Sequence, residues 1–166
     1  MTEVDEALFE VRLLDVPLVL RERSRQHGAD LLREMELISL GHTAGTTHHE
    51  LPQRLLELAQ ELERVYGPYV AANTDEMDAA LDRGEDTLAE VVYHLPTRSV
   101  SFMDHVEEIL REVDEYCREG QELLTLAPPA DVTVYREWTS SEVRRQYAGE
   151  PPTPWPAFAE RRALSS

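Results

Sequence analysis

Three of the six histidines of this chain fall in one short stretch, GHTAGTTHHE, at residues 41–50. His42, His48, His49 and Glu50 are residue types that bind transition metals, but a metal site needs three or four ligands that converge. His48, His49 and Glu50 are consecutive, so their side chains diverge, and the chain contains no HxxxH, HExxH or ExxH pattern. Glycines and threonines dominate the stretch, so we expect a connecting loop and no metal or other cofactor.

The other candidates for acid–base or nucleophilic chemistry are isolated in the sequence. His94 ends an alternating apolar segment, and His27 lies with Ser24 on the apolar side of an expected helix. Ser24, His27 and His94 are therefore candidates for a small-molecule or catalytic site in a bundle core. The alternative for His27 is a core histidine that is hydrogen-bonded to a neighbour. For Cys117, the single cysteine, we favour a small buried hydrophobe over a reactive thiol.

The basic residues exclude some chemistry. All 16 are arginine, so the chain offers no lysine for a Schiff base or a phosphate-binding loop. No glycine-rich nucleotide loop or nucleophile elbow is present either. The 33 acidic residues give a net charge of −17, which repels nucleic acid and anionic lipid but is compatible with a basic surface on a protein partner.

One segment, TVYREWTSSEVRRQYAGEPPTPWP at residues 133–156, concentrates aromatic and arginine side chains. Such side chains dominate protein interfaces because they combine a large contact area with polar tips. The candidates for a protein-interaction surface are Tyr135, Arg136, Trp138, Arg144, Arg145 and Trp155. The alternative is that these residues form core contacts and internal salt bridges with the glutamate-rich helices.

Two short strands and several helices must position these residues. Residues 7–17 alternate, with Phe9, Val11 and Leu13 on one side, and residues 87–96 form a second strand; each strand ends in a proline. Apolar residues at helical spacing predict four longer helices, over residues 18–40, 51–66, 96–119 and 130–147. A capping-box pattern that starts at Asn73 predicts one short helix at residues 75–83.

The sequence therefore predicts a mainly α fold, an irregular helical bundle of four longer helices plus one short helix, with a minor two-stranded β ribbon. Residues 1–149 would form a single helical domain. Residues 150–166 would form a proline-rich C-terminal tail, extended at its start, with Trp155 and Phe158 packed back on the bundle.

The two strand–proline–helix units look alike, because LLREMEL at residues 31–37 matches ILREVDE at residues 109–115. This similarity is compatible with an internal duplication or with chance. A duplication would predict that the strands pair and that the two long helices pack together. Wide apolar faces on several helices are also compatible with a homodimer.

The N-terminal sequence MTEVDEALFE is acidic, where a secretory signal would be basic and then apolar. No apolar run approaches the roughly 20 residues that span a bilayer. We therefore expect a cytoplasmic protein that binds neither a membrane nor nucleic acid.

The segment YCREGQELLTLAPPADVTVYREWTSSEVRRQYAGEPPTPWP resembles an uncharacterised family of actinobacterial helical domains. That family carries a segment of the type EFCRxGxLLTLxxPPExVxFRxWxxxEVxRQ before a GEPPTPW-like end, and HLPTRSV and LPQRLLELAQELERVYGPY are similar to it as well. Such domains occur alone or beside kinase-like ATPases of the anti-sigma-factor type. The resemblance implies a non-enzymatic regulatory or protein-interaction domain in bacterial partner switching, and it implies no catalytic residue.

Overall fold

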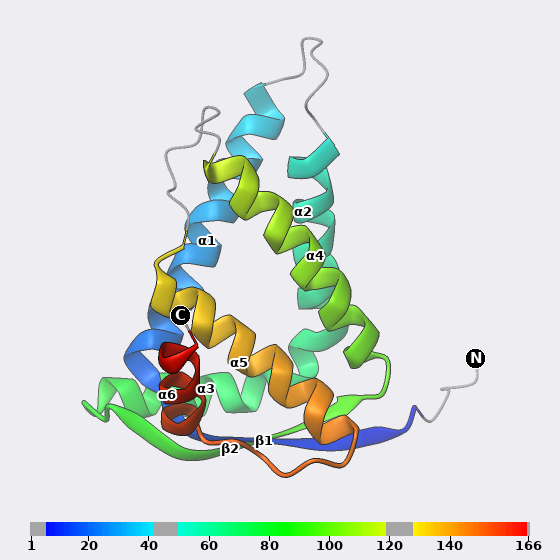
Figure 1. Ribbon diagram of the computed structural model, residues 1–166. Helices are drawn as coiled ribbons and strands as arrows, with labels where there is room; N and C mark the ends of the chain where they lie inside the picture. The colour runs from blue at the N-terminus through cyan, green and yellow to red at the C-terminus, as the bar shows by residue number, and fades with distance from the viewer. Residues whose placement is uncertain (1–5, 42–49, 119–127, 166) are drawn as a thin grey trace.

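The computed structural model describes residues 6–41, 50–118 and 128–165. In these ranges the chain is mainly helical with a small antiparallel ribbon, which confirms the predicted fold class (Figure 1). The elements are β1 (Leu8–Pro17), α1 (Leu18–Gly41), α2 (Glu50–Glu61), a π-helical turn η1 (Leu62–Tyr66), α3 (Gly67–Asp82), β2 (Thr87–Pro96), α4 (Ser99–Arg118), α5 (Ala130–Tyr147) and α6 (Trp155–Leu164). None of the described helices is long and apolar enough to cross a membrane.

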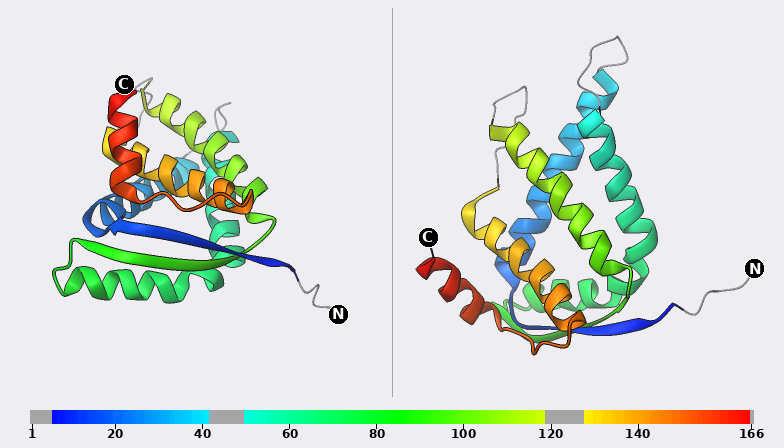
Figure 2. Two further views of the ribbon diagram at one scale, coloured as in Figure 1. Left: turned by 60° about the horizontal axis from the view of Figure 1, so that its bottom comes forward. Right: turned by 45° about the vertical axis from the view of Figure 1, so that its right-hand side comes forward.

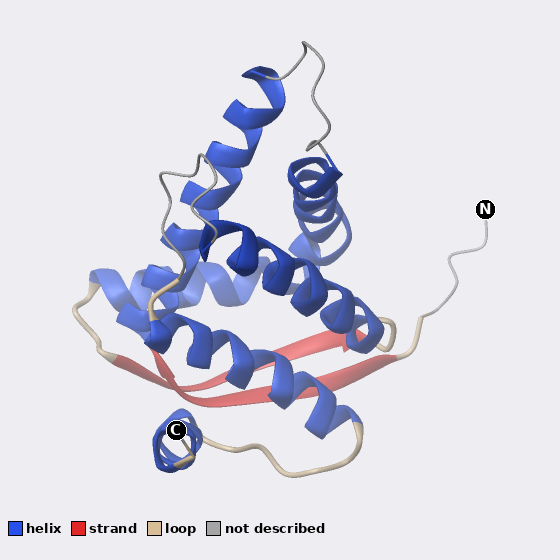
Figure 3. Cartoon of the chain, turned by 45° about the horizontal axis from the view of Figure 1, so that its top comes forward, coloured by secondary structure: helices blue, strands red, loops and turns tan. Residues whose placement is uncertain are grey.

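The two strands pair antiparallel along their whole length, from Leu8 opposite Pro96 to Pro17 opposite Thr87. Val11 and Leu13 are buried on the inner face, as their alternation predicts. The alternation changes phase at Asp15, which adopts a φ of 54°, so that Val16 is also buried. The helices cover this inner face and leave the other face of the ribbon open (Figures 1 and 3).

A side-chain amide is hydrogen-bonded to the backbone at each edge of the ribbon, and the two amides contact paired residues of β1 and β2. The Arg12 N–H donates to Gln146 Oε1 at 2.8 Å, and Gln146 Nε2 donates to the Arg12 carbonyl oxygen at 2.8 Å. On the opposite edge, Asn73 Nδ2 donates to the Val92 carbonyl oxygen at 2.7 Å. Arg12 and Val92 are partners in the register. Helices α5 and α3, which supply these amides, therefore lie along the two edges (Figure 2).

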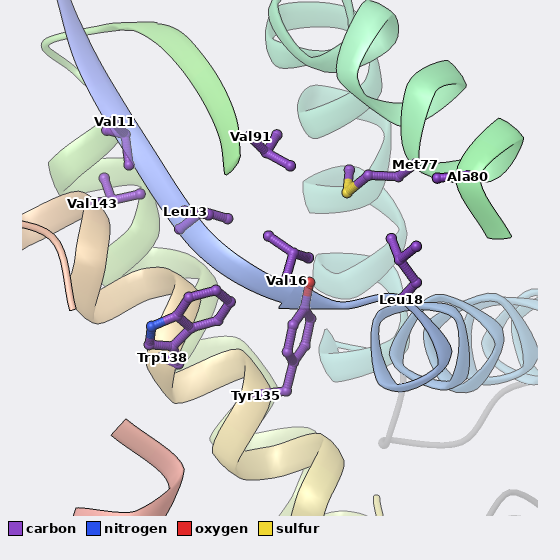
Figure 4. Packing of buried hydrophobic residues seen from close by; sticks show 10 residues of the cluster. All are labelled: Val11, Leu13, Val16, Leu18, Met77, Ala80, Val91, Tyr135, Trp138 and Val143. Carbon is purple, nitrogen blue, oxygen red and sulfur yellow. The ribbon is translucent and has the colours of Figure 1, made fainter. Parts of the chain in front are cut away.

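Two clusters of buried side chains form the core. The first joins the ribbon to α3 and α5 and consists of Val11, Leu13, Val16, Leu18, Met77, Ala80, Val91, Tyr135, Trp138 and Val143 (Figure 4). The second joins the long helices and consists of Leu31, Leu55, Leu58, Tyr66, Phe102 and Ile109. The predicted pairing of the two strands is present. Helices α1 and α4 leave opposite ends of the ribbon and both contribute to the second cluster, but each packs mainly against α2 and they make few direct contacts with each other. The internal duplication therefore stays a prediction.

The helix around Asn73 differs from the sequence-based expectation. A capping box at Asn73 was expected to open a short helix at residue 75, but α3 begins at Gly67, with Pro68 in its first turn. The turn η1 leads directly into α3, so the GPY sequence at residues 67–69 lies where the helix changes direction and does not form a loop (Figure 1). Asn73 lies inside α3, and its side-chain amide donates to the backbone of β2 instead of capping a helix.

The C-terminal segment also contains a helix. Residues 150–154 are extended, as predicted, but the prolines are followed by α6, which begins at Trp155 with Pro156 in its first turn, a position that tolerates proline. Trp155 and Phe158 pack against the first core cluster, in line with the expectation that they fold back on the bundle.

Arginine–carboxylate pairs join neighbouring helices across the fold. They are Arg21–Asp78 (α1–α3), Arg23–Asp131 (α1–α5), Arg54–Glu112 (α2–α4), Arg136–Asp114 and Arg144–Asp104 (both α5–α4), and Arg162–Glu137 (α6–α5). The pairs whose side chains are both exposed, such as Arg23–Asp131 and Arg162–Glu137, contribute about 0–1 kcal/mol each. Their main effect is to fix how the helices are aligned.

Candidate functional site

The aromatic residues predicted to form an interaction surface are part of the core. Trp138 is 0% exposed, and its Nε1–H donates to the Thr153 carbonyl oxygen at 2.9 Å. Tyr135 is buried, and the rings of Tyr135, Trp138 and Trp155 lie 5.5–5.9 Å from one another. Figure 4 shows Tyr135 and Trp138 extending from α5 toward β1.

The three arginines of the same prediction form internal ion pairs. Arg136 contacts Asp114 at 3.4 Å, and Arg144 contacts both Asp104, at 2.7 Å, and Glu107, at 2.6 Å. The pKa of Glu107 is held below its usual range: burial raises it, but hydrogen bonds from Arg144 and Ser140 outweigh that effect.

Arg145 belongs to a buried network that we call the tail junction, made by Glu142, Arg145, Gln146 and Thr153. Glu142 is 0% exposed. Its Oε1 accepts from Arg145 Nη1 at 2.8 Å, and its Oε2 accepts from Gln146 Nε2 at 2.8 Å and from the Thr153 N–H at 2.9 Å. The network therefore connects α5, the extended segment before α6 and, through Gln146, the edge of β1. The EVRRQ and GEPPTPW segments of the sequence meet here.

The three predicted core-pocket residues are not brought together. His94 lies on the open face of the ribbon with 63% of its side chain exposed, and its Nε2 is 3.6 Å from Glu10 Oε2 across the two strands. Ser24 and His27 are half-buried on α1, at the other end of the ribbon from His94.

A cavity of about 310 Å³, which we call the central cavity, lies instead between the inner face of the ribbon and the helices. Its walls are Val11, Leu13, Arg21, Leu62, Tyr66, Val70, Thr74, Met77, Tyr93, Leu95, Ser99, Met103, Tyr135, Thr139 and Val143. Most of these side chains are apolar, and a few polar groups converge among them, which is the usual composition of a small-molecule site. The other hollows in the described part of the chain have more charged side chains in their walls, mixed with apolar ones.

The polar end of the central cavity is formed by Arg21, Tyr93 and Tyr135. Arg21 is 9% exposed, and its Nη1 donates to Asp78. Burial raises the pKa of both tyrosines, and the Arg21 charge opposes that effect only partly. Both hydroxyls are therefore neutral at physiological pH, and no hydrogen bond joins either of them to another described residue.

A further hydroxyl in the wall has no regular hydrogen bond. Ser99 is 1% exposed, and its Oγ makes no hydrogen bond of acceptable geometry in the described structure. Burial raises the pKa of the neighbouring Tyr66 hydroxyl, and the Arg98 charge and the nearby Ser99 hydroxyl oppose that effect only partly. A buried polar group without a full partner costs free energy, so its place in a cavity wall points to a ligand.

The central cavity was missed by sequence reasoning because its polar residues come from separate elements. Arg21 lies on α1, Tyr93 on β2 and Ser99 at the start of α4, and none of them belongs to a motif that indicates binding or catalysis. One signal was available: Tyr93 alternates with Val91 and Leu95, so a tyrosine hydroxyl had to point inward from β2.

The described residues contain no group of three or more His, Cys, Asp or Glu side chains able to hold a metal ion. His42, His48 and His49 lie outside the described residues, as does the side chain of Cys117. Comparison with protein-family models, with curated proteins and with solved structures gave no match to this chain. The resemblance to the actinobacterial domains therefore stays a prediction.

Proposed function

We propose that this chain is a small-molecule-binding domain whose ligand occupies the central cavity. The observation that carries the proposal is the combination of a mostly apolar cavity of about 310 Å³, with the Tyr93 and Tyr135 side chains in its wall, and a buried Ser99 Oγ in the same wall that has no regular hydrogen bond. A protein interior is normally close-packed and its polar groups are satisfied. A ligand with an apolar body and a polar end would correct both departures.

The proposed site has no arrangement of residues that would drive a reaction. The tyrosine hydroxyls are neutral, and His94 lies on the open face of the ribbon. The site therefore fits binding, and a sensor or carrier role follows more directly from it than catalysis does.

Binding can be tested with butylbenzene, a neutral apolar probe of suitable size. Tyr135 lies in the cavity wall, and its ring centroid is 5.9 Å from Trp138, so tryptophan fluorescence should report occupancy. We expect saturable binding and a higher melting temperature, because a ligand that binds only the folded state stabilises it.

Variants that fill the cavity distinguish binding inside it from nonspecific binding to the surface. Thr74→Met and, independently, Val70→Phe place bulk into the cavity wall and should abolish the butylbenzene signal while the protein stays folded. The exposed Thr87, outside the wall, gives the matched control Thr87→Met, which should bind as the unchanged chain does. A signal that survives both filling variants, or no signal up to the solubility limit, would refute the proposal.

A regulatory protein-interaction domain is the second candidate. Its support is the distribution of charge: six described arginines are held in pairs between helices, while the net charge is −17, so carboxylates dominate the outside and suit a basic partner. Native mass spectrometry of the protein recovered gently from its host tests both candidates. A stoichiometric protein companion supports interaction, and a small added mass supports the cavity.

A further inference from the structure

The chemistry of the central cavity defines the class of ligand more narrowly, and this step rests on the proposed function. The size comes first. An apolar cavity of about 150 Å³ holds benzene, so the central cavity, at about 310 Å³, accepts a ligand of roughly 10–15 non-hydrogen atoms. Apolar side chains such as Leu13, Val70 and Met77 line the part of the cavity that such a molecule would contact.

The polar end of the cavity is rich in hydrogen-bond donors. Arg21 can only donate, and within the described residues its single hydrogen bond runs from Nη1 to Asp78. Tyr93 and Tyr135 line the same cavity, and each hydroxyl is neutral at physiological pH and has a proton to donate. A ligand that offers a hydrogen-bond acceptor at this end, such as a carbonyl oxygen, suits these donors.

The charges around Arg21 decide between a charged and an uncharged acceptor. Arg21 is already paired with Asp78, and Glu22 Oε2 lies 3.9 Å from its Nη1. A ligand carboxylate would enter a site whose cation is already neutralised, and it would be repelled by the net charge of −17. Burying an ion without a free counter-ion is strongly unfavourable.

We infer that the ligand is a neutral, mostly apolar molecule with one carbonyl oxygen, which is hydrogen-bonded by the Tyr93 and Tyr135 hydroxyls beside Arg21. The apolar body of the ligand lies toward Leu62 and Met77, and its carbonyl group points to the tyrosines. An anion, although attractive to an isolated arginine, is excluded here by Asp78.

Three isosteric probes test the inference: 4-phenyl-2-butanone, 3-phenylpropionate and isopentylbenzene, which place a ketone, a carboxylate and a hydrocarbon group on the same phenylethyl frame. Titration calorimetry and tryptophan fluorescence give their affinities for the full chain. We expect the ketone to bind at least about 10-fold more tightly than the carboxylate.

Removing one hydroxyl isolates its role. Tyr135→Phe and Tyr93→Phe should each weaken ketone binding by about 5-fold to 10-fold, the effect of one hydrogen bond, and should leave isopentylbenzene binding unchanged or tighter. The matched control is Tyr147→Phe, because Tyr147 is exposed and packs edge-on against Phe9; it should change neither affinity.

The outcomes separate the two proposals. A carboxylate that binds as tightly as the ketone, or ketone affinity that is unchanged in both phenylalanine variants, would overturn the inference and leave a cavity for apolar molecules. Failure of both the hydrocarbon and the ketone to bind would overturn the proposed function as well.

Discussion

Helix α5 takes part in two buried polar regions, the tail junction and the central cavity, and these regions are satisfied to different degrees. At the tail junction, both carboxylate oxygens of Glu142 accept hydrogen bonds. At the central cavity, the hydroxyls of Tyr93 and Tyr135 have no such partners among the described residues. Helix α5 thus contributes to one polar region whose hydrogen bonds are satisfied within the protein, the closed network, and to one whose hydroxyls lack such partners, the open network.

The comparison distinguishes structural from functional polar groups in this fold. The residues that looked most like an interaction surface in the sequence, above all Trp138 and Arg145, are used to hold α5 and the C-terminal segment together. The less conspicuous Tyr93 and Ser99 line the open site. Composition alone did not separate the two roles, whereas the number of hydrogen-bond partners does.

The largest effect should come from breaking the closed network. Glu142→Ala leaves the buried Thr153 N–H without its acceptor and removes one of the two carboxylates paired with Arg145, which keeps Glu150, so we expect a loss of about 2–3 kcal/mol of unfolding free energy. Urea unfolding followed by circular dichroism measures it. In the matched control Glu137→Ala, the lost pair with Arg162 is exposed, and about 1 kcal/mol or less should be lost. Equal losses would show that the junction is not a cooperative network.

An intermediate effect should appear at low pH through Glu107, which bridges Arg144 and Ser140. Its pKa is lowered in the folded state, so its stabilisation is complete above the ordinary glutamate value of about 4.3 and is lost as the pH falls through the lowered value. Glu107→Gln should therefore lose less stability between neutral and acidic pH than the unchanged chain, by about 1 kcal/mol or less because the pair is partly exposed.

Urea midpoints at several pH values between 3 and 6 give this comparison. The exposed neighbour Glu108 supplies the control Glu108→Gln. If the acid-dependent loss were the same in Glu107→Gln as in the unchanged chain, the Arg144 ion pair would not contribute to stability.

The smallest effect should come from the open network. Tyr135→Phe removes a hydroxyl from the wall of the central cavity, so stability should change by less than about 0.5 kcal/mol, or even rise, because no hydrogen bond to a described residue is lost. Urea unfolding in the absence of ligand is the measurement. A loss above about 1 kcal/mol would mean that the hydroxyl is bonded, and the contrast with Glu142 would disappear.

Local patterns in the sequence predicted the fold because its elements are local. The alternation around Val11 and Leu13 predicted β1, and helical spacing predicted the long helices. The prediction failed where a distant segment competes for a side chain: Asn73 has the sequence context of a helix cap, but β2 takes its amide.

The candidate site could not be predicted for the same reason. The packing of α5, α6 and the ribbon decides the environment of each residue. It places Trp138 against Thr153 and not on a surface for a partner, and it places Tyr93 beside a cavity and not beside a hydrogen-bonding side chain. No spacing rule within one element contains that information. The charge pattern did indicate internal salt bridges as an alternative for Arg136, Arg144 and Arg145, and such pairs are present.

The pairing of β1 with β2 has a consequence for how the protein is made. Leu8 pairs with Pro96, and α1, α2 and α3 lie between the two strands in the chain. Because synthesis adds roughly 5–20 residues per second, β2 leaves the ribosome several seconds after β1, and the two strands cannot pair before then. The amides of Asn73 and Gln146 close the ribbon only after that, so the nascent chain exposes an unpaired strand throughout the interval and depends on its early helices to remain soluble.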